Sequence, residues 1–422
     1  MTTRTTKLLA WFGKKVIAKY QPLVIGVTGS IGKTSTRHAI AAVLSAKYTV
    51  REPEKNYNNE LGIPFTIIGT HGLDEGGGKL GWLRIFAKAA RVLWFPTNYP
   101  KVAVLEFGID HPGDMDHLLK IVQPSIAVLT TIGISHKEFF NTEKEIAHEK
   151  GKMAAGLPSD GTFIYNIDDT HVKEQTSRTT ANLLSFGINN PADIKVENVE
   201  ERLGLKPSTT ITIQTPTRKI IARVYVVGAA HIGAITAAVA VAEKMEVETD
   251  LILKGLNNYR PVPGRLNIIA GIKHSTIIDD TYNAAPLSMT EALNLLYRFP
   301  EENKMAVLGD MLELGDLTQS SHQKIGQLAA SMKLGSLVTV GEFGKIIGDS
   351  AKMAGMPSDR IHWFETSDKA RKPVQDMLVP GSTVLIKGSQ GARMEKVTKE
   401  IMAEPMRAGE LLCRQYGKWL DS

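Results

Sequence analysis

The chain has 422 residues, of which 43% are apolar and 22% charged, a composition typical of a soluble globular protein with two or three domains. Its formal charge of +6 is too small and too scattered to indicate a nucleic-acid partner, and no apolar run reaches the roughly 18 residues that a transmembrane helix needs. The single cysteine, Cys413, excludes an internal disulfide framework and a multi-cysteine zinc site, so we expect a cytoplasmic protein.

Residues 1–21 are predicted to form an N-terminal amphipathic helix. Five apolar residues recur there at helical spacing, namely Leu8, Leu9, Phe12, Val16 and Tyr20. Lysines lie beside them, and we expect the apolar side to pack on the domain that follows. Contact with a membrane surface is the alternative, because basic amphipathic helices occur in both settings. The aromatic and basic stretch 81–96 allows the same two interpretations.

A buried strand, a glycine-rich turn and a helix are predicted next. The turn lies in GVTGSIGKTST (26–36), whose glycines do not follow the usual G-x-x-x-x-G-K-[ST] spacing. A helix N-terminus preceded by glycines presents backbone N–H groups to an anion. Lys33 can reach the outer phosphates of a nucleotide, and the Thr34 hydroxyl can join a Mg²⁺ shell. This segment therefore predicts an ATP site.

Strands and helices alternate along the rest of the chain. Strand candidates at 102–108, 126–133 and 162–168, with helical patterns between several of them, predict a mostly parallel sheet, and residues 192–227 predict antiparallel strands. An alanine-rich helix is expected from about Ile235 to Met245. The proline-rich segment NNYRPVPGRLNII marks a boundary, after which STIIDD, KMAVLGD, SLVTVG and STVLIKGS predict the strands of a second α/β unit. We therefore expect a central P-loop ATPase domain at 22–261 and a Rossmann-like domain at 262–422.

Polar residues follow two of the predicted strands and lie on one helix. Glu106 ends the strand VAVLEFG, His136 follows IAVLTTIG, and Lys150 lies in the helix EIAHEKGKMAAG. Open α/β sheets bind ligands at the carboxyl ends of their strands. Each residue alone is an ordinary ion-pair partner, loop histidine or surface lysine, so only the whole set indicates a site.

The ordered set of motifs resembles the Mur ligase family of ATP-dependent amide-forming ligases. It includes the loop at 26–36, NYNNELGIP (56–64), VLEFGIDHPGD (104–114), DDTYNAAP (279–286) and KGSQGARME (387–395). The family's loop reads G-x-T-G-[ST]-x-G-K-T, which accounts for the shifted glycines. NYNNELGIP, DDTYNAAP and VLGDMLELG resemble the branch that uses UDP-N-acetylmuramoyl-tripeptide and D-alanyl-D-alanine as substrates.

The resemblance implies a reaction and a set of catalytic residues. A substrate carboxylate attacks the γ-phosphate of ATP to give an acyl phosphate, and an amine then displaces the phosphate. By the same resemblance, Lys33 and a Mg²⁺ on Thr34 and Glu106 hold the phosphates. A second Mg²⁺ binds His136 and the carbamate formed when Lys150 takes up CO₂.

Further site residues are implied by the same resemblance. Arg265 reaches the phosphates when the second domain closes, and Asp280 contacts ATP. The expected ATP-binding residues are Thr28, Gly29, Ser30, Ile31, Gly32, Lys33, Thr34, Ser35, His231, Arg265, Asp280 and Asn283. The expected substrate-binding residues are Asn58, Asn59, Lys387, Ser389 and Arg393.

The chain departs from the family pattern at several places. Only about twenty residues precede the ATPase strand, where family members usually carry a UDP-binding domain. Substitutions relative to the family occur at four positions, namely Lys152, Ile232, Thr236 and Ala285. Two other functions stay open: a folylpolyglutamate-type or cyanophycin-type ligase with another amine substrate, and a P-loop binding ATPase without ligase activity. We expect a monomer.

Overall fold

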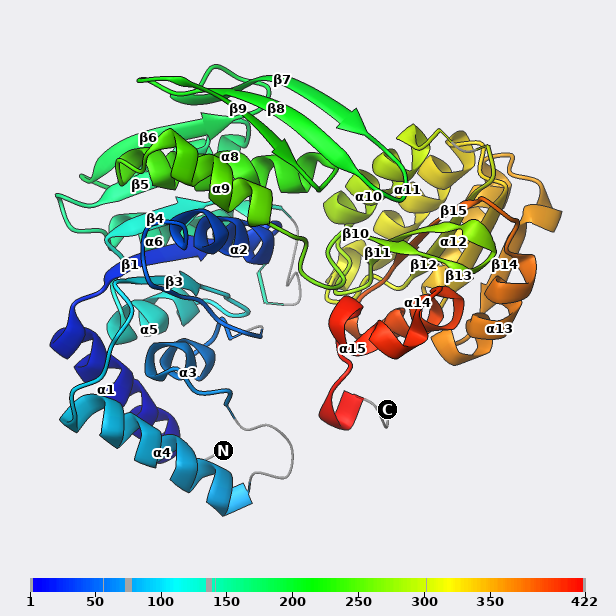
Figure 1. Cartoon of the computed structure of the whole chain (residues 1–422). Helices are drawn as coiled ribbons and strands as arrows, with labels where there is room; N and C mark the ends of the chain where they lie inside the picture. Colours follow the sequence, from blue (N-terminus) through cyan, green and yellow to red (C-terminus); the bar gives the residue numbers. More distant parts are fainter. Residues whose placement is uncertain are drawn as a thin grey trace.

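A computed structural model describes residues 3–55, 57–72, 78–133, 139–140, 142–300 and 302–419. The chain forms two β-sheets, one within residues 23–224 and one within residues 267–387. Figure 1 shows the two sheets beside each other, each with helices packed on it. This arrangement confirms the expected α/β class, with a mainly parallel first sheet.

The first sheet has nine strands in the order β2-β3-β1-β4-β5-β6-β7-β8-β9. Their bounds are β1 Leu23–Thr28, β2 Val50–Arg51, β3 Val102–Glu106, β4 Ile126–Leu129, β5 Thr162–Asn166, β6 Asn182–Gly187, β7 Ile194–Arg202, β8 Ser208–Gln214 and β9 Lys219–Val224. Strands from β2 to β7 pair in parallel, whereas β7, β8 and β9 pair antiparallel as predicted. The sequence analysis missed β2 and β6, because β2 is two residues long and β6 begins with exposed residues.

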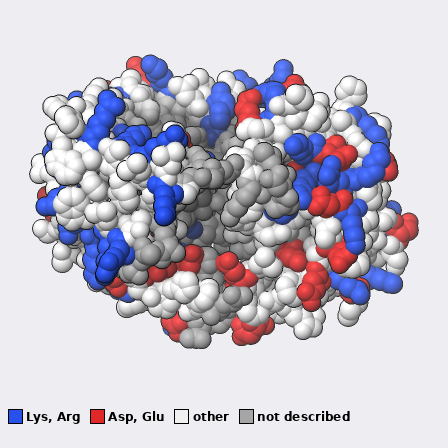
Figure 2. All heavy atoms as spheres, turned by 90° about the horizontal axis from the view of Figure 1, so that it is seen from below, with Lys and Arg blue, Asp and Glu red and all other residues white. Residues whose placement is uncertain are grey.

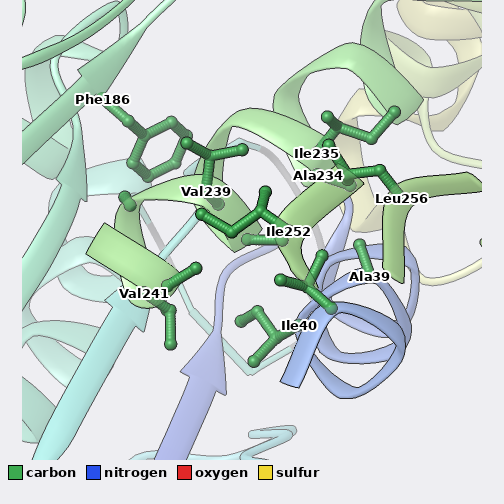
Figure 3. Close-up of a cluster of buried hydrophobic side chains, with 14 of the residues drawn as sticks. Ala39, Ile40, Phe186, Ala234, Ile235, Val239, Val241, Ile252 and Leu256 are labelled. Atoms are coloured by element: carbon green, nitrogen blue, oxygen red, sulfur yellow. The ribbon is translucent and has the colours of Figure 1, made fainter. Parts of the chain in front are cut away.

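Three helices cover one face of this sheet, namely α2 Lys33–Leu44, α8 Ala229–Lys244 and α9 Thr249–Asn258. Their side chains form one core cluster with the strands, and Figure 3 shows Ile40 of α2 beside Ile252 of α9 and Val239 of α8. The predicted start of α8 near Ile235 was wrong, because the helix begins at Ala229 after Gly228. A helix buried on nearly every side lacks the amphipathic period from which its first turn could be recognised.

Six helices lie on the opposite side, namely α1 Thr3–Tyr20, α3 Gly62–Ile68, α4 Gly78–Trp94, α5 Asp114–Ile121, α6 Glu143–Ala155 and α7 Thr170–Glu174. The expected packing of α1 is confirmed for Leu9, Phe12 and Val16, which are buried, but Leu8 points outward and is 46% exposed. Helix α4 packs against α1 and α3. Among the described residues, no helix is both long and apolar enough to cross a membrane.

The second sheet has six strands in the order β10-β11-β15-β12-β13-β14. Their bounds are β10 Asn267–Ala270, β11 Thr276–Asp280, β12 Lys304–Gly309, β13 Ser336–Val340, β14 Ile361–Phe364 and β15 Thr383–Lys387. Its helices are α10 Pro286–Arg298, α11 Thr318–Ser331 and α12 Gly344–Met353 on one face, with α13 Ser367–Met377, α14 Glu395–Ile401 and α15 Ala408–Leu411 on the other. The four predicted strands are confirmed; the edge strands β10 and β14, which are short and incompletely buried, were missed.

Candidate active site

The phosphate loop joins β1 to α2 and adopts a backbone that requires glycine at two positions. Gly29 has a φ of 150°, and a Cβ atom there would lie 2.0 Å from Thr130 Oγ1. Gly32 has a φ of 82° in the left-handed region and forms the N-cap of α2. A helix N-terminus preceded by glycines in this conformation is the backbone arrangement that receives phosphate oxygens in such loops.

The loop is tied to the neighbouring strands by hydrogen bonds. Thr28 Oγ1 donates to the carbonyl of Phe107 (2.8 Å), and Ser30 Oγ donates to the carbonyl of Gly133 (2.9 Å). Lys33 Nζ donates to the carbonyl of Gly29 (2.8 Å) within the loop itself. The structure thus ties the hydroxyl of Thr28 to the residue after β3, and the side chain of Lys33 is folded back onto the loop that precedes it.

Thr34 and Glu106 meet at the carboxyl ends of the adjacent strands β1 and β3. Thr34 Oγ1 donates to Glu106 Oε2 (3.0 Å), and Asn58 Nδ2 donates to Glu106 Oε1 (3.2 Å). Hydroxyl and carboxylate oxygens are ligands that Mg²⁺ prefers, so this pair fits the expected metal. Among the described residues, here or elsewhere, no three His, Cys, Asp or Glu side chains gather as a metal site. His136 lies outside the described residues.

Lys150 is buried in α6 near the phosphate loop and is only 1% exposed. Burial lowers the pKa of its ammonium group well below the usual value, and the nearby charge of Lys33 lowers it further. Another lysine of this helix, Lys152, forms ion pairs with Asp116 (2.6 Å) and Glu149 (2.7 Å). Two lysines on one helix thus have opposite environments, and Lys150 is the one that favours a neutral amine.

We call the residues up to Asn258, where α9 ends, the first half of the chain, and the residues after it the second half. A pocket between these two halves brings most of the expected ATP-binding residues together. From the first half it includes Ser30, Ile31, Gly32, Thr34, Ser35 and His231. From the second half it includes Arg265, Asp280, Asn283 and Lys387. The guanidinium of Arg265 lies 4.0 Å from the centre of the Tyr282 ring, and no described residue accepts a hydrogen bond from its buried Nε. A buried guanidinium nitrogen without an acceptor suits an anionic ligand.

His231 joins the first half of the chain to Arg265. Its Nε2 lies 3.0 Å from the carbonyl oxygen of Arg265, and its Nδ1 lies 2.9 Å from the hydroxyl of Tyr259. Since a carbonyl only accepts, Nε2 carries the proton and Nδ1 accepts from Tyr259. Burial lowers the pKa of His231 to about 4, so the ring is neutral. Both nitrogens are therefore engaged within the protein, and Nε2 positions the backbone of Arg265.

The expected substrate residues fall in different places. Lys387 Nζ donates to Asp280 Oδ2 (2.5 Å) and lies in the pocket with the ATP-binding residues. Asn59 Oδ1 accepts from the backbone of Gly62 (2.9 Å) at the start of α3. Ser389 is buried, and Arg393 donates to Glu395 Oε1 (2.6 Å). Of this group, only Lys387 lies among the residues of the pocket, and Asn58 reaches the carboxylate of Glu106.

A larger cavity of about 710 Å³ lies next to the pocket and shares Thr34 and Arg265 with it. Its other lining residues include Arg37, Tyr57, Phe65, Tyr282, Arg414, Tyr416 and Trp419. The sequence analysis missed these residues. Arg37 could have been found, because it lies one helical turn after Thr34, but the C-terminal residues reach the cavity only through tertiary packing.

The comparisons with known proteins agree with this geometry. Residues 87–242 match the Mur ligase middle domain, and residues 264–390 match the Mur ligase, glutamate ligase domain. The chain is 28% identical over 403 residues to the UDP-N-acetylmuramoyl-tripeptide--D-alanyl-D-alanine ligase of Bacillus subtilis, covering 95% of this chain and 80% of that protein.

Two solved structures extend the comparison. MurF from Acinetobacter baumannii has a TM-score of 0.77 at 28% identity, covering 95% of this chain and 80% of that chain. The MurF ligase from Thermotoga maritima in complex with ADP has a TM-score of 0.77 at 25% identity, covering 94% and 83%. Together the two domain matches span more than half of the 422 residues. The chain belongs to the Mur ligase family.

Proposed function

We propose that this protein is an ATP-dependent ligase that joins the free carboxyl group of UDP-N-acetylmuramoyl-tripeptide to the amine of D-alanyl-D-alanine, in peptidoglycan precursor synthesis. The observation that carries the proposal is the meeting of Thr34, Glu106 and the buried Lys150 around one phosphate loop. Relatives with this named activity align over nearly the whole chain, which supports the choice of substrates.

ATP is proposed to bind in the pocket between a central domain at 22–261 and a C-terminal domain at 262–422. Its phosphates would lie on the backbone of residues 29–35, with Lys33 and Arg265 as cations. Support comes from the pocket lining, which joins the loop to Arg265, and from the buried Nε of that arginine. Closure of the two domains would exclude water from a labile acyl phosphate.

Two Mg²⁺ ions are proposed, one held by Thr34 and Glu106 and one by His136 and a carbamate on Lys150. When bound, the ions would supply positive charge that screens the triphosphate from an approaching carboxylate. Carbamate formation joins the neutral Nζ of Lys150 to the carbon of CO₂ and releases one proton. The lowered pKa of Lys150 supports this step, because only the neutral amine has the lone pair that attacks CO₂.

The larger cavity is the proposed site of the acyl substrate, since it adjoins Thr34 and Arg265 on the phosphate side of the pocket. A carboxylate oxygen would attack the γ-phosphorus, and the bond between that phosphorus and the bridging oxygen of ADP would break. The amine would then attack the acyl carbon, phosphate would leave, and the amine nitrogen would lose a proton. Arg265, near both cavities, would stabilise the charge on the transferred phosphoryl group.

A product assay by mass spectrometry tests the proposal. The full chain is incubated with ATP, Mg²⁺, UDP-N-acetylmuramoyl-tripeptide and, in separate reactions, D-alanyl-D-alanine, glutamate or aspartate. We expect a pentapeptide product and ADP only with D-alanyl-D-alanine. Glutamate or aspartate ligation would instead favour a folylpolyglutamate-type or cyanophycin-type ligase. Phosphate release that ignores both substrates would favour a binding ATPase.

A further inference from the structure

The outward surface of α1 and α4 combines exposed apolar side chains with basic ones. On α1 the exposed basic and large apolar residues are Arg4, Lys7, Leu8, Trp11, Lys14, Lys15 and Lys19, and on α4 and the residue after it they are Lys79, Leu80, Leu83, Arg84, Lys88, Arg91, Trp94 and Phe95. We call these residues the α1–α4 face. Leu83, Trp94 and Phe95 are 65%, 64% and 63% exposed, although such side chains are usually buried in a water-soluble protein.

The two helices present these residues on one continuous surface. Helices α1 and α4 lie side by side in Figure 1, and the ring of Phe12 contacts both Phe86 (6.1 Å) and Trp94 (6.0 Å) of α4. Trp11 packs against the same Phe12 ring from α1, with ring centres 5.0 Å apart. The exposed indoles of Trp11 and Trp94 therefore flank one buried phenyl ring.

Hydrogen bonds hold the two helices in this arrangement. Lys19 Nζ donates to the carbonyls of Leu93 (2.9 Å) and Phe95 (3.0 Å), where α4 ends, and the Tyr20 hydroxyl donates to the carbonyl of Val92 (2.8 Å). These bonds satisfy carbonyls that lack partners at the end of a helix. The face is thus a fixed surface on the folded chain.

Charge on this surface has one sign. Helix α1 has five Lys or Arg residues and α4 has four, and neither helix contains Asp or Glu. Since the whole chain carries +6, the remaining residues carry a net formal charge of −3. Figure 2 views the molecule from below, and on its left side Lys and Arg stand among uncharged residues, whereas Asp and Glu gather along the lower edge and on the right.

The basic side chains of the face differ from other surface lysines and arginines of this chain. On α13, for example, Lys369 pairs with Glu365 and Lys372 pairs with Asp376. On the α1–α4 face, by contrast, no carboxylate of the described residues forms an ion pair with a Lys or Arg. This positive charge is therefore available to an external anionic surface.

We propose that the α1–α4 face docks the protein onto an anionic lipid bilayer. Exposed Trp, Phe and Leu side chains with interspersed Lys and Arg match a bilayer interface, where the indole rings lie at headgroup level and the cations meet anionic headgroups. Neither helix is apolar enough to span the membrane, so both lie along its surface. The proposal rests on this surface and is independent of the ligase reaction.

Docking would place the larger cavity beside the bilayer. Phe65 of α3 lines that cavity, and its ring lies 6.2 Å from the ring of Trp82 on α4. One layer of side chains thus separates the cavity wall from the helix that carries the lipid-facing residues.

Vesicle flotation with the full chain tests the proposal. We expect the protein to float with vesicles of phosphatidylcholine and phosphatidylglycerol at low salt, and not with phosphatidylcholine alone. The double variants Leu83→Ser/Trp94→Ser and Lys14→Glu/Lys15→Glu should each lower the partition coefficient at least about tenfold. Matched controls elsewhere on the surface, Ile221→Ser and Lys206→Glu/Lys352→Glu, should float like the unchanged protein. Circular dichroism would establish that each variant is folded.

Three outcomes would overturn the proposal. One is a folded protein that does not float with anionic vesicles. A second is equal flotation of the face variants and the controls, because binding would then not depend on this surface. The third is a dimer in size-exclusion chromatography that the face variants convert to monomer while vesicle binding stays unchanged, since the face would then bind a second copy of the chain.

Discussion

The chemistry expected of Lys150 depends on the surroundings of its side chain rather than on its residue type. A lysine on a helix is normally a solvated cation, but here burial and the nearby Lys33 lower its pKa. Lys152, two residues later, is held as a cation by Asp116 and Glu149. The contrast between these two lysines provides a matched pair for experiment.

We predict that Lys150→Ala lowers ligation at least about a hundredfold, because the proposed metal ligand would be lost. Added acetate should restore part of the activity by supplying the missing carboxylate oxygen. The rate of product formation with and without acetate measures both effects. Lys152→Ala should keep most of the activity, and unchanged activity in the Lys150 variant would contradict the carbamate.

His231 should make stability depend on pH. Its pKa is about 4 in the folded chain and about 6.5 when exposed, so the unfolded chain binds the extra proton between these values. Above pH 6.5, neutral His231 makes its full contribution to the free energy of unfolding. As the pH falls from 6.5 to about 4, that free energy decreases by on the order of 3 kcal/mol.

Denaturant unfolding of the unchanged protein and of His231→Gln measures this prediction. Other groups titrate equally in both proteins, so the difference between their free energies of unfolding isolates His231. That difference should shrink as the pH falls from 7 to 4. A difference that does not change with pH would show that the histidine is not buried as a neutral ring.

At the scale of elements, the proposed phosphate site depends on the backbone of the turn between β1 and α2. Position 29 has no room for a side chain, because a Cβ atom would meet Thr130 Oγ1. At Gly233, within α8, a Cβ atom would meet no described atom within 4 Å beyond the backbone of its own helix. Of these two glycines in the first half of the chain, only Gly29 is therefore required by a close contact.

We predict that Gly29→Ala weakens ATP binding at least about tenfold, since the loop would have to shift away from the shape proposed to bind phosphate. Gly233→Ala should raise the free energy of unfolding by about 0.5–1 kcal/mol, because it removes backbone freedom from the unfolded chain. Isothermal titration with ATP and thermal unfolding measure the two effects. Normal ATP affinity in the Gly29 variant would argue against the loop as the phosphate site.

At the scale of the whole molecule, the proposed reaction needs a cation from the second half of the chain at a loop of the first. Arg265 lines both the smaller pocket and the larger cavity, and its backbone carbonyl accepts from His231. Lys55 also lies 4.2 Å from the centre of the Tyr416 ring, a second contact between the halves. The site is therefore complete only when both halves are present.

We predict that Arg265→Ala lowers kcat by about 10²–10³ without unfolding the protein, because one cation would be removed from the proposed site of the transferred phosphoryl group. Arg260→Ala is the matched control, since Arg260 is exposed and its guanidinium lies over the Tyr225 ring (4.9 Å), outside both cavities. Steady-state kinetics with saturating ATP measures the effect. An equal loss in both variants would point to general destabilisation of the segment.

Local pattern was enough to establish the α/β class, the parallel core of each sheet and the phosphate loop. The mostly apolar runs 102–106 and 383–387 are buried on both faces of their sheets. Such a run can be recognised in the sequence without knowing which helices pack on it. The motif at 26–36 likewise depends on neighbouring residues, because its glycines, Lys33 and Thr34 belong to one turn and one helix.

Contacts between distant segments determined the remaining features of the site and the surface. The burial of a side chain and its hydrogen-bond partners are not set by the residues next to it in the sequence. Three features of the site depend on residues far away in the chain. They are the lowered pKa of Lys150, the hydrogen bonds of both His231 nitrogens and the pairing of Lys387 with Asp280. The same holds for the cavity wall formed by residues 412–416 and Trp419, and for the side of α1 on which Leu8 remains exposed. The helical periodicity of α1 distinguishes two faces of that helix. The packing of α3 and α4 against α1 determines which face is exposed to water.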